Sequence, residues 1–168
     1  MKKLIIINGP MGIGKTTVCQ ELKRLMAPCF YLDGDWAWMM EPFTVTDENK
    51  EMVLQNIRFL LQNYLENDFA QNILFSWVIP QEEIFDLITD DLTDTDFEVV
   101  KITLTASENS LISRLEDDIV LGLRKREIVE KSLAYLDNYK SMKTHKIMTD
   151  NKTPLQIAKE IKLYSDIN

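Results

Sequence analysis

Residues 9–16 read Gly-Pro-Met-Gly-Ile-Gly-Lys-Thr, and they follow the apolar run Leu4–Ile7 after a single asparagine. The run contains three isoleucines, a composition that favours a buried strand of a parallel sheet. Beyond the glycines, Val18 and Leu22 begin an apolar face at helical spacing, in a helix expected from about Lys15. The order of strand, glycine-rich turn and helix predicts an α/β fold.

The eight residues match the pattern GxxxxGK[ST] in full, in the expected position between a strand and a helix. Glycines let the backbone approach phosphate oxygens, and the N–H groups of the loop and the helix N-terminus supply partial positive charge. Lys15 is expected to reach the β- and γ-phosphates of ATP, and the Thr16 hydroxyl is expected to bind Mg²⁺. The predicted nucleotide-binding residues here are Gly9, Pro10, Met11, Gly12, Ile13, Gly14, Lys15, Thr16 and Thr17.

Four further apolar runs predict strands, and the amphipathic segments between them predict helices. The expected strands cover residues 29–32, 73–78, 97–104 and 146–149, and the expected helices include 48–66, 81–91 and 125–142. Ser107 is expected to cap a helix, and Thr153, Pro154 and Gln156 form the pattern of a capping box at the start of the last one. These elements predict a three-layer α/β/α sandwich with a five-stranded, mostly parallel sheet, in a single domain of residues 1–168.

Composition is that of a soluble globular chain, because 45% of the 168 residues are hydrophobic and 27% are charged. No segment reaches membrane-spanning length or forms a signal peptide, so we expect a cytoplasmic protein without a membrane partner. Cys19 and Cys29 are too few for a disulfide framework, and we interpret both as reduced and buried. The single histidine, His145, is interpreted as structural or exposed, and without a Cys/His cluster a zinc site is not expected.

The net charge of -8 is unevenly placed along the chain. Residues 59–100 contain ten acids and no Lys or Arg, so this segment carries -10 and the rest carries +2. Such a surface would repel a nucleic-acid backbone, and we expect no nucleic-acid partner. The aspartates between Asp86 and Asp96 are interpreted as a solvated helix end and loop rather than a metal site.

Three absences narrow the class of phosphate-binding protein. The nearest approach to the guanine-reading pattern Asn-Lys-x-Asp is Asn151-Lys152-Thr153-Pro154, which lacks the final acid. The third expected strand ends without the acidic pair of a motor ATPase, and no transporter-type signature is present. A small phosphotransferase is therefore the best class, and an ATP-binding regulator with weak or no transfer activity is the alternative from another class.

The chain resembles the small-molecule and nucleoside-monophosphate kinase superfamily in four segments that occur in the expected order. They are the loop GPMGIGKT, the turn LDGD after the second strand, the segment LISRL, and TDNKTP before the last helix. It is most similar to small bacterial members such as the tunicamycin-resistance and chloramphenicol-phosphotransferase-like kinases. The resemblance implies a P-loop NTPase fold with a small helical lid at about 114–128.

The resemblance also implies roles for individual residues. Asp33 and Asp35 would face the acceptor, one as the base and one holding a Mg²⁺-bound water, with Asp33 the first choice for the base. Arg114 would stack on adenine or clamp phosphate, and the lid would bring Arg124, Lys125 and Arg126 to the transferring group. Glu116, Asp117 and Asp118 stand where relatives often carry further arginines, which shifts the lid cations or weakens catalysis. Asn151 and Lys152 would cover the adenine.

The acceptor side is defined less sharply. Trp36, Trp38, Met39, Met40 and Phe43 follow the acidic turn, where they could line an apolar acceptor pocket or pack a short helix on the core. Ser76 and Trp77 lie at the carboxyl end of the third strand, where α/β sheets bind ligands. The sequence thus predicts an ATP- and Mg²⁺-dependent kinase that phosphorylates a hydroxyl of a small molecule, with a nucleotide or nucleoside as the alternative acceptor. The acidic turn disfavours an anionic acceptor. The sequence is compatible with both a monomer and a homodimer.

Overall fold

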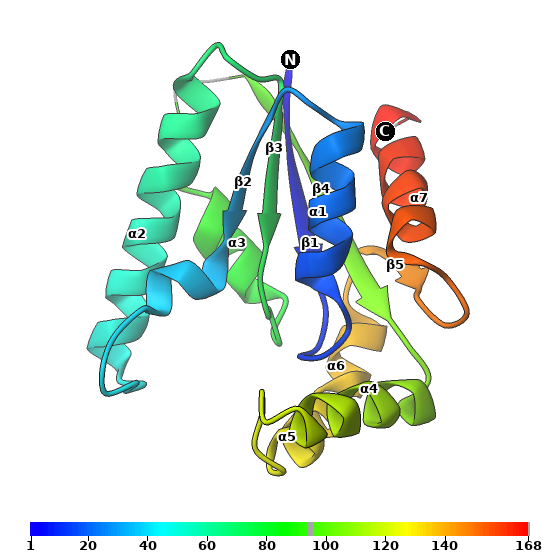
Figure 1. The fold of residues 1–168 in the computed structure, drawn as a ribbon. Coiled ribbons are helices and arrows are strands. Elements are labelled where there is room, and N and C mark those ends of the chain that lie inside the picture. The colour runs from blue at the N-terminus through cyan, green and yellow to red at the C-terminus, as the bar shows by residue number, and fades with distance from the viewer. Residues whose placement is uncertain (94–95, 168) are drawn as a thin grey trace.

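The computed structural model describes residues 1–93 and 96–167, which form a parallel sheet covered by helices on both faces (Figure 1). The strands are β1 (Lys2–Asn8), β2 (Cys29–Asp33), β3 (Asn72–Ser76), β4 (Phe97–Thr105) and β5 (His145–Met148). They pair in the order β2-β3-β1-β4-β5, and each pairing is parallel. The helices are α1 (Lys15–Leu25), a 3-10 helix η1 (Gly34–Trp38), α2 (Asp47–Glu66), α3 (Glu83–Thr89), α4 (Glu108–Val120), α5 (Ile128–Ala134), α6 (Leu136–Ser141) and α7 (Pro154–Ile167).

The side chains of β1 point alternately to the two faces of the sheet, and this alternation explains the three layers. The side chains of Leu4 and Ile6 belong to the core cluster that α2 and α3 cover, whereas Ile5 and Ile7 belong to the cluster under α1 and α7. All four residues are fully buried, which is why this strand reads as a continuous apolar run. The predicted α/β/α sandwich is confirmed, and the sheet is parallel throughout the described residues.

The carboxyl ends of the strands point toward one end of the molecule, where η1, α4, α5 and α6 gather (Figure 1). The loop after β1 leaves the sheet between β3 and β4, since β1 lies at the centre of the strand order. This is the edge at which open α/β sheets bind ligands.

Two helix predictions differ from the structure. The helix expected over 125–142 consists of two short helices that meet at Tyr135, because Leu136 buries itself in one core cluster and Tyr139 in the other. The lid region expected at about 114–128 begins inside α4, where the acids at 116–118 lie. They continue the solvent side of an amphipathic helix whose buried face carries Leu111 and Leu115.

Smaller differences concern a strand end and a cysteine. β3 ends at Ser76 rather than at residue 78, because the Asn8 side chain takes the N–H of Ile79 and turns the chain away from the sheet. Cys19 is buried as expected, whereas Cys29 is only half-buried.

The start of α7 is confirmed in atomic detail. The hydroxyl of Thr153 accepts from the N–H of Gln156, and the N–H of Thr153 donates to Oε1 of Gln156 at 2.8 Å. Ser107 caps α4 in the same way, by accepting from the N–H of Ser110.

Within residues 1–93 and 96–167, no helix has both the length and the apolar composition needed to cross a bilayer. Asp94 of the acidic segment lies outside the described residues.

Candidate functional site

The backbone of the glycine-rich loop between β1 and α1 forms an open curve. Gly12 has φ of 78°, and a Cβ atom there would lie 2.5 Å from Cδ2 of Leu115, so this position excludes a larger residue. Gly14 is the N-cap of α1 in a left-handed conformation, and no side chain caps the first turn of this helix. The first N–H groups of α1 are therefore free to meet an anion.

Lys15 is half-buried beneath this loop, and its ammonium donates to the carbonyl oxygens of Gly9 at 2.8 Å and Pro10 at 2.9 Å. Burial lowers the pKa of Lys15 to about 8, although the carboxylates of Asp35 and Asp33 raise it in part. An anion placed in the loop would supply the missing compensation, because phosphate favours the charged form of the lysine.

Asp33 is the most tightly held acid of the site and is 7% exposed. Its Oδ2 accepts from the hydroxyl of Thr16 at 3.2 Å and from that of Tyr31 at 3.0 Å. Its Oδ1 accepts from the N–H of Asp35 at 3.1 Å, which is the N-cap contact of η1. Asp33 thus joins the end of β2 to the first turn of α1.

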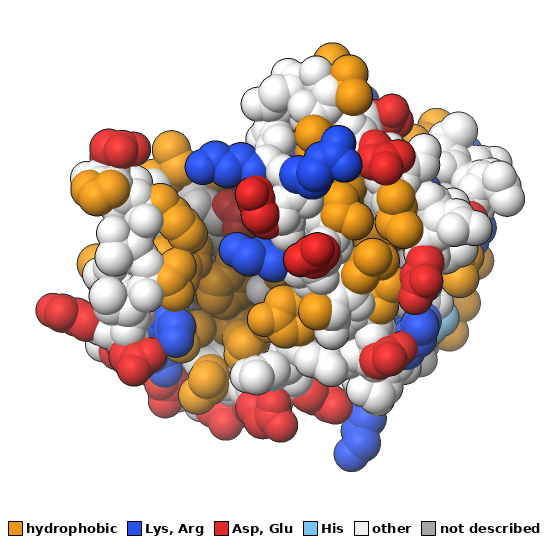
Figure 2. Space-filling view, turned by 90° about the horizontal axis from the view of Figure 1, so that it is seen from below, with side chains coloured by type: hydrophobic (Ala, Val, Ile, Leu, Met, Phe, Trp, Pro, Cys, Tyr) orange, Lys and Arg blue, Asp and Glu red, His pale blue; other side chains and the backbone are white. Residues whose placement is uncertain are grey.

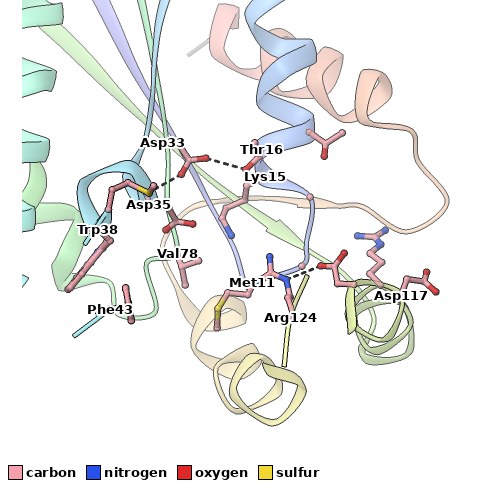
Figure 3. Close-up of a pocket in the computed structure, with 16 residues that line it drawn as sticks. Met11, Lys15, Thr16, Asp33, Asp35, Trp38, Phe43, Val78, Asp117 and Arg124 are labelled. Carbon is pink, nitrogen blue, oxygen red and sulfur yellow. Dashed lines mark hydrogen bonds and ion pairs between the residues drawn. The ribbon is translucent and has the colours of Figure 1, made fainter. Parts of the chain in front are cut away.

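Asp35 lies two residues further on, within η1, and its side chain faces the pocket (Figure 3). Burial and the neighbouring charge of Asp33 raise the pKa of Asp35 above its ordinary value, while Lys15, Arg124 and a hydrogen bond from Trp77 act in the opposite direction. The Trp77 ring packs so closely on Gly34 that a Cβ there would lie 2.4 Å from Cγ of the ring. The glycine of the Asp-Gly-Asp turn is therefore required by this contact.

The oxygen atoms around Thr16 suit a magnesium ion. Mg²⁺ prefers oxygen ligands and usually binds through one or two protein groups, waters and phosphates rather than a cage of side chains. The Thr16 hydroxyl and the Asp33 carboxylate offer such a pair. Among the described residues, no group of three or more His, Cys, Asp or Glu side chains could form an all-protein metal site.

The pocket around these groups has a volume of about 790 Å³ and lies at the carboxyl edge of the sheet. Figure 3 shows Lys15 between Asp33, Asp35, Trp38, Phe43 and Val78 on one side and Met11, Arg124 and Asp117 on the other. The apolar wall comes from η1 and the segments after η1 and β3, and the polar wall comes from α4 and the segment that follows it.

The predicted lid arginines occupy three different settings. Arg114 donates to the carbonyl oxygen of Ile13 at 3.2 Å and to the hydroxyl of Thr149 at 2.9 Å, so it ties the glycine-rich loop to the segment before α7. Arg124 lines the pocket, and its Nε lies 2.8 Å from Oδ2 of Asp118. Arg126 is exposed and does not line the pocket.

Several predicted residues lie away from the pocket walls. Lys125 is exposed, and so is Asn151, which has a positive φ of 57°. Lys152 pairs with Glu160 on α7 at 2.8 Å. The Trp36 ring makes an edge-to-face contact with Tyr31, and Trp36 lines a neighbouring groove. Ser76 is buried and hydrogen-bonded, and it lies behind the acidic turn.

Two polar residues of the site were not predicted from the sequence. Asn8 is fully buried, and its Oδ1 accepts from the N–H groups of Gly9 at 2.7 Å and Ile79 at 2.9 Å. Tyr31 is buried and links Asp33 to Ser76. Strand alternation could have indicated Tyr31, because residues two apart in a strand share a face and Asp33 follows at that spacing.

Comparison with known proteins supports the fold. The family model described as "AAA domain" matches residues 5–146. A cytidylate kinase of Buchnera aphidicola is 26% identical over 88 residues, which cover 52% of this chain and 38% of that relative's length. The match to this curated relative thus spans well under half of the relative.

Solved structures match almost the whole chain. The tunicamycin resistance protein of Deinococcus radiodurans has a TM-score of 0.69 at 20% identity, covering 98% of this chain and 96% of the other. A gluconokinase of Sinorhizobium meliloti has a TM-score of 0.68 at 16% identity, covering 99% and 95%. These likenesses establish the P-loop kinase-like fold that the sequence resemblance implied.

Proposed function

The chain belongs to the AAA domain family, and from this premise we propose that it is an ATP- and Mg²⁺-dependent kinase that transfers the γ-phosphate to a hydroxyl of a small molecule. One observation carries the proposal. Lys15 and Thr16 of the predicted nucleotide-binding loop and the acids Asp33 and Asp35 border one pocket that has an additional apolar wall. A site for phosphates alone would not need that wall.

The loop and α1 would hold the phosphates of the nucleotide. The N–H groups of the first turn and the ammonium of Lys15 would face the β- and γ-phosphates, which then replace the carbonyl oxygens of Gly9 and Pro10 as partners of the lysine. Thr16 and Asp33 would hold Mg²⁺, directly and through water. When bound, this ion neutralises charge that develops on the β- and γ-phosphate oxygens.

We assign the base to Asp35 and a positioning role to Asp33, the reverse of the first choice made from the sequence. Asp33 already accepts three hydrogen bonds and is almost fully buried, so it is held in place. Asp35 is more accessible, and its raised pKa makes its carboxylate a stronger base than that of an ordinary aspartate.

In the transfer step, the acceptor oxygen displaces ADP from the γ-phosphorus. Asp35 takes the proton of the acceptor hydroxyl while the acceptor oxygen forms its bond to the γ-phosphorus. The bond from that phosphorus to the β–γ bridging oxygen breaks, and ADP leaves. Lys15 and Arg124 stabilise the charge on the transferring group, since both border the same pocket.

One observation favours an ATP-binding regulator as the second candidate. Arg124 is paired with Asp118, and it is the pocket-lining arginine of the segment between α4 and α5. If the ion pair persists when nucleotide binds, the charge available to the transition state falls, and binding without efficient transfer results.

The test is acceptor-dependent ADP release with Mg·ATP, measured across nucleosides, nucleoside monophosphates, sugars, aminoglycosides and other hydroxylated antibiotics. Mass spectrometry of the acceptor confirms the added phosphoryl group. Lys15→Ala should abolish the release, and Lys159→Ala, an exposed lysine on α7, serves as the matched control. Tight ATP binding without acceptor-dependent release by any class would favour the regulator instead.

A further inference from the structure

Charge is distributed unequally between the walls of the pocket. Its cations are Lys15, Arg114 and Arg124. In the proposed function Lys15 and Arg124 face the phosphates of the nucleotide, and Arg114 is held by Ile13 and Thr149. On the opposite wall, which η1 and the segments after η1 and β3 form, the charged groups are carboxylates.

The groups on that opposite wall are otherwise apolar. Trp38, Met39, Phe43 and Val78 line the pocket beside Asp35, and none of them carries a positive charge. An anionic acceptor would lie beside two carboxylates in a partly desolvated site without a free cation among the described lining residues. Burying such a charge unpaired is costly.

A second hollow continues from this wall. A groove of about 490 Å³ lies between η1 and α2, and its described lining contains no charged residue. Met39 lines both the groove and the pocket, so the two are neighbours. The groove's apolar lining includes Trp36, Met39, Met52, Phe59, Leu60 and Tyr64.

These side chains remain accessible although they are apolar. Trp36 is 56% exposed, Phe59 is 69% exposed and Met39 is 84% exposed. Figure 2 shows this end of the molecule hollowed beside α2, with hydrophobic side chains inside and charged ones along the rim. A contiguous apolar surface that continues a candidate active site marks a ligand-binding groove.

We infer that the acceptor is an uncharged hydroxyl compound with an apolar chain, whose hydroxyl meets Asp35 and whose chain lies in the groove between η1 and α2. The inference rests on the proposed function for the role of Asp35. The groove's size suits such a chain, because small-molecule pockets occupy about 300–1,000 Å³. A cationic head would pair with Asp35 and thereby block the carboxylate that must take the proton.

The experiment uses matched compounds that differ only in charge or in chain length. The uncharged series is 1,2-propanediol, 1,2-hexanediol and 1,2-octanediol. The charged counterparts are 2-hydroxyoctanoate and 2-amino-1-octanol. Binding to the full chain, with a non-hydrolysable Mg·ATP analogue present, is followed by tryptophan fluorescence, because Trp36 and Trp38 line the two hollows.

The affinity of the diols should rise about threefold to fourfold for each added methylene, the change expected when a methylene leaves water. Octanediol should bind at least about tenfold more tightly than either charged counterpart. Equal affinities along the diol series, or tighter binding of the acid or the amine, would overturn the inference.

A variant in the groove locates the effect. Phe59→Glu places a charge on an exposed position of α2 and should remove the dependence on chain length while leaving binding of the ATP analogue unchanged. Leu163→Glu, at a 63% exposed position of α7, is the matched control and should retain that dependence. A chain-length dependence that survives Phe59→Glu would place the chain elsewhere and overturn the assignment of the groove.

The measurements of binding and of phosphoryl transfer distinguish a failure of the inference from a failure of the proposed function. Chain-length-dependent diol binding without ADP release for any acceptor would support the groove and refute the kinase proposal. Phosphoryl transfer to the anionic compound alone would support the kinase proposal and refute the inference about the acceptor.

Discussion

The hydroxyl of Tyr31 lies 3.0 Å from Oδ2 of Asp33 and 2.9 Å from Oγ of Ser76. Burial raises the pKa of Tyr31 far above its ordinary value, so the phenol stays protonated and donates to the carboxylate. Its single proton is thereby used, and Ser76 is the donor in the second contact. A chain of hydroxyl groups from β3 and β2 thus fixes the acid that also accepts from Thr16.

Tyr31→Phe tests whether this chain positions Asp33. We expect kcat to fall about tenfold to a hundredfold while KM for ATP changes less than about threefold, because the nucleotide loop is untouched and a buried charge-assisted hydrogen bond is lost. Steady-state kinetics give the two constants. Ser76→Ala is the matched control and should cost less, since the bond from Tyr31 to Asp33 survives. Equal losses in kcat/KM for both variants, caused by KM alone, would contradict a positioning role.

Protonation of Lys15 should accompany nucleotide binding. The pKa of Lys15 is lowered to about 8 in the free protein, and phosphate favours the charged form, so binding raises it. At pH 8.5 roughly three quarters of the free lysines are neutral, against about a tenth at pH 7, and binding should take up a corresponding fraction of a proton. Affinity should therefore decline as the pH rises above about 8.

Titration calorimetry of the ATP analogue in buffers of different ionisation enthalpy measures this uptake. Lys15→Met, which keeps the apolar stem without the ammonium, should bind more weakly and show no uptake at pH 8.5. Uptake that persists in Lys15→Met would assign the proton to another group.

Asp35 should govern the acid side of the rate profile. Its raised pKa, caused first by burial and then by Asp33, means that the carboxylate is lost at a higher pH than for an ordinary aspartate. The rate constant kcat/KM should thus fall as pH decreases through that raised value, and Asp35→Asn should lower it by about a hundredfold or more and remove this limb. A normal acid limb in Asp35→Asn would return the role of base to Asp33.

The two arginines after α4 should differ in their contribution to transfer. Arg124 lines the pocket, whereas Arg126 is exposed outside it. Arg124→Ala should lower kcat about tenfold to a thousandfold, and Arg126→Ala should change it less than about threefold. Comparable losses in both variants would indicate that this segment moves and brings Arg126 to the phosphates, as the resemblance to kinase lids implied.

The sequence by itself determined the fold because its strongest signals are local. The apolar run Leu4–Ile7 and the glycines that follow specify a strand and a tight loop without help from distant residues, and the capping box at Thr153 fixes a helix start in the same way. Helix breaks that depend on packing have no such local signal. The division between α5 and α6 at Tyr135 is one of these breaks.

The arrangement of the site is a matter of tertiary structure. The sequence singled out Asp33, Asp35 and Lys15, but only the pairing of β2 with β3 brings Ser76 beside Asp33. Only the folded structure supplies the burial and the neighbouring charges that change the pKa values of Lys15 and Asp35. The groove between η1 and α2 has no sequence pattern of its own, since it joins residues from two elements separated by a loop. Local propensity depends on neighbours along the chain, whereas charge compensation, desolvation and cavity shape depend on neighbours in space.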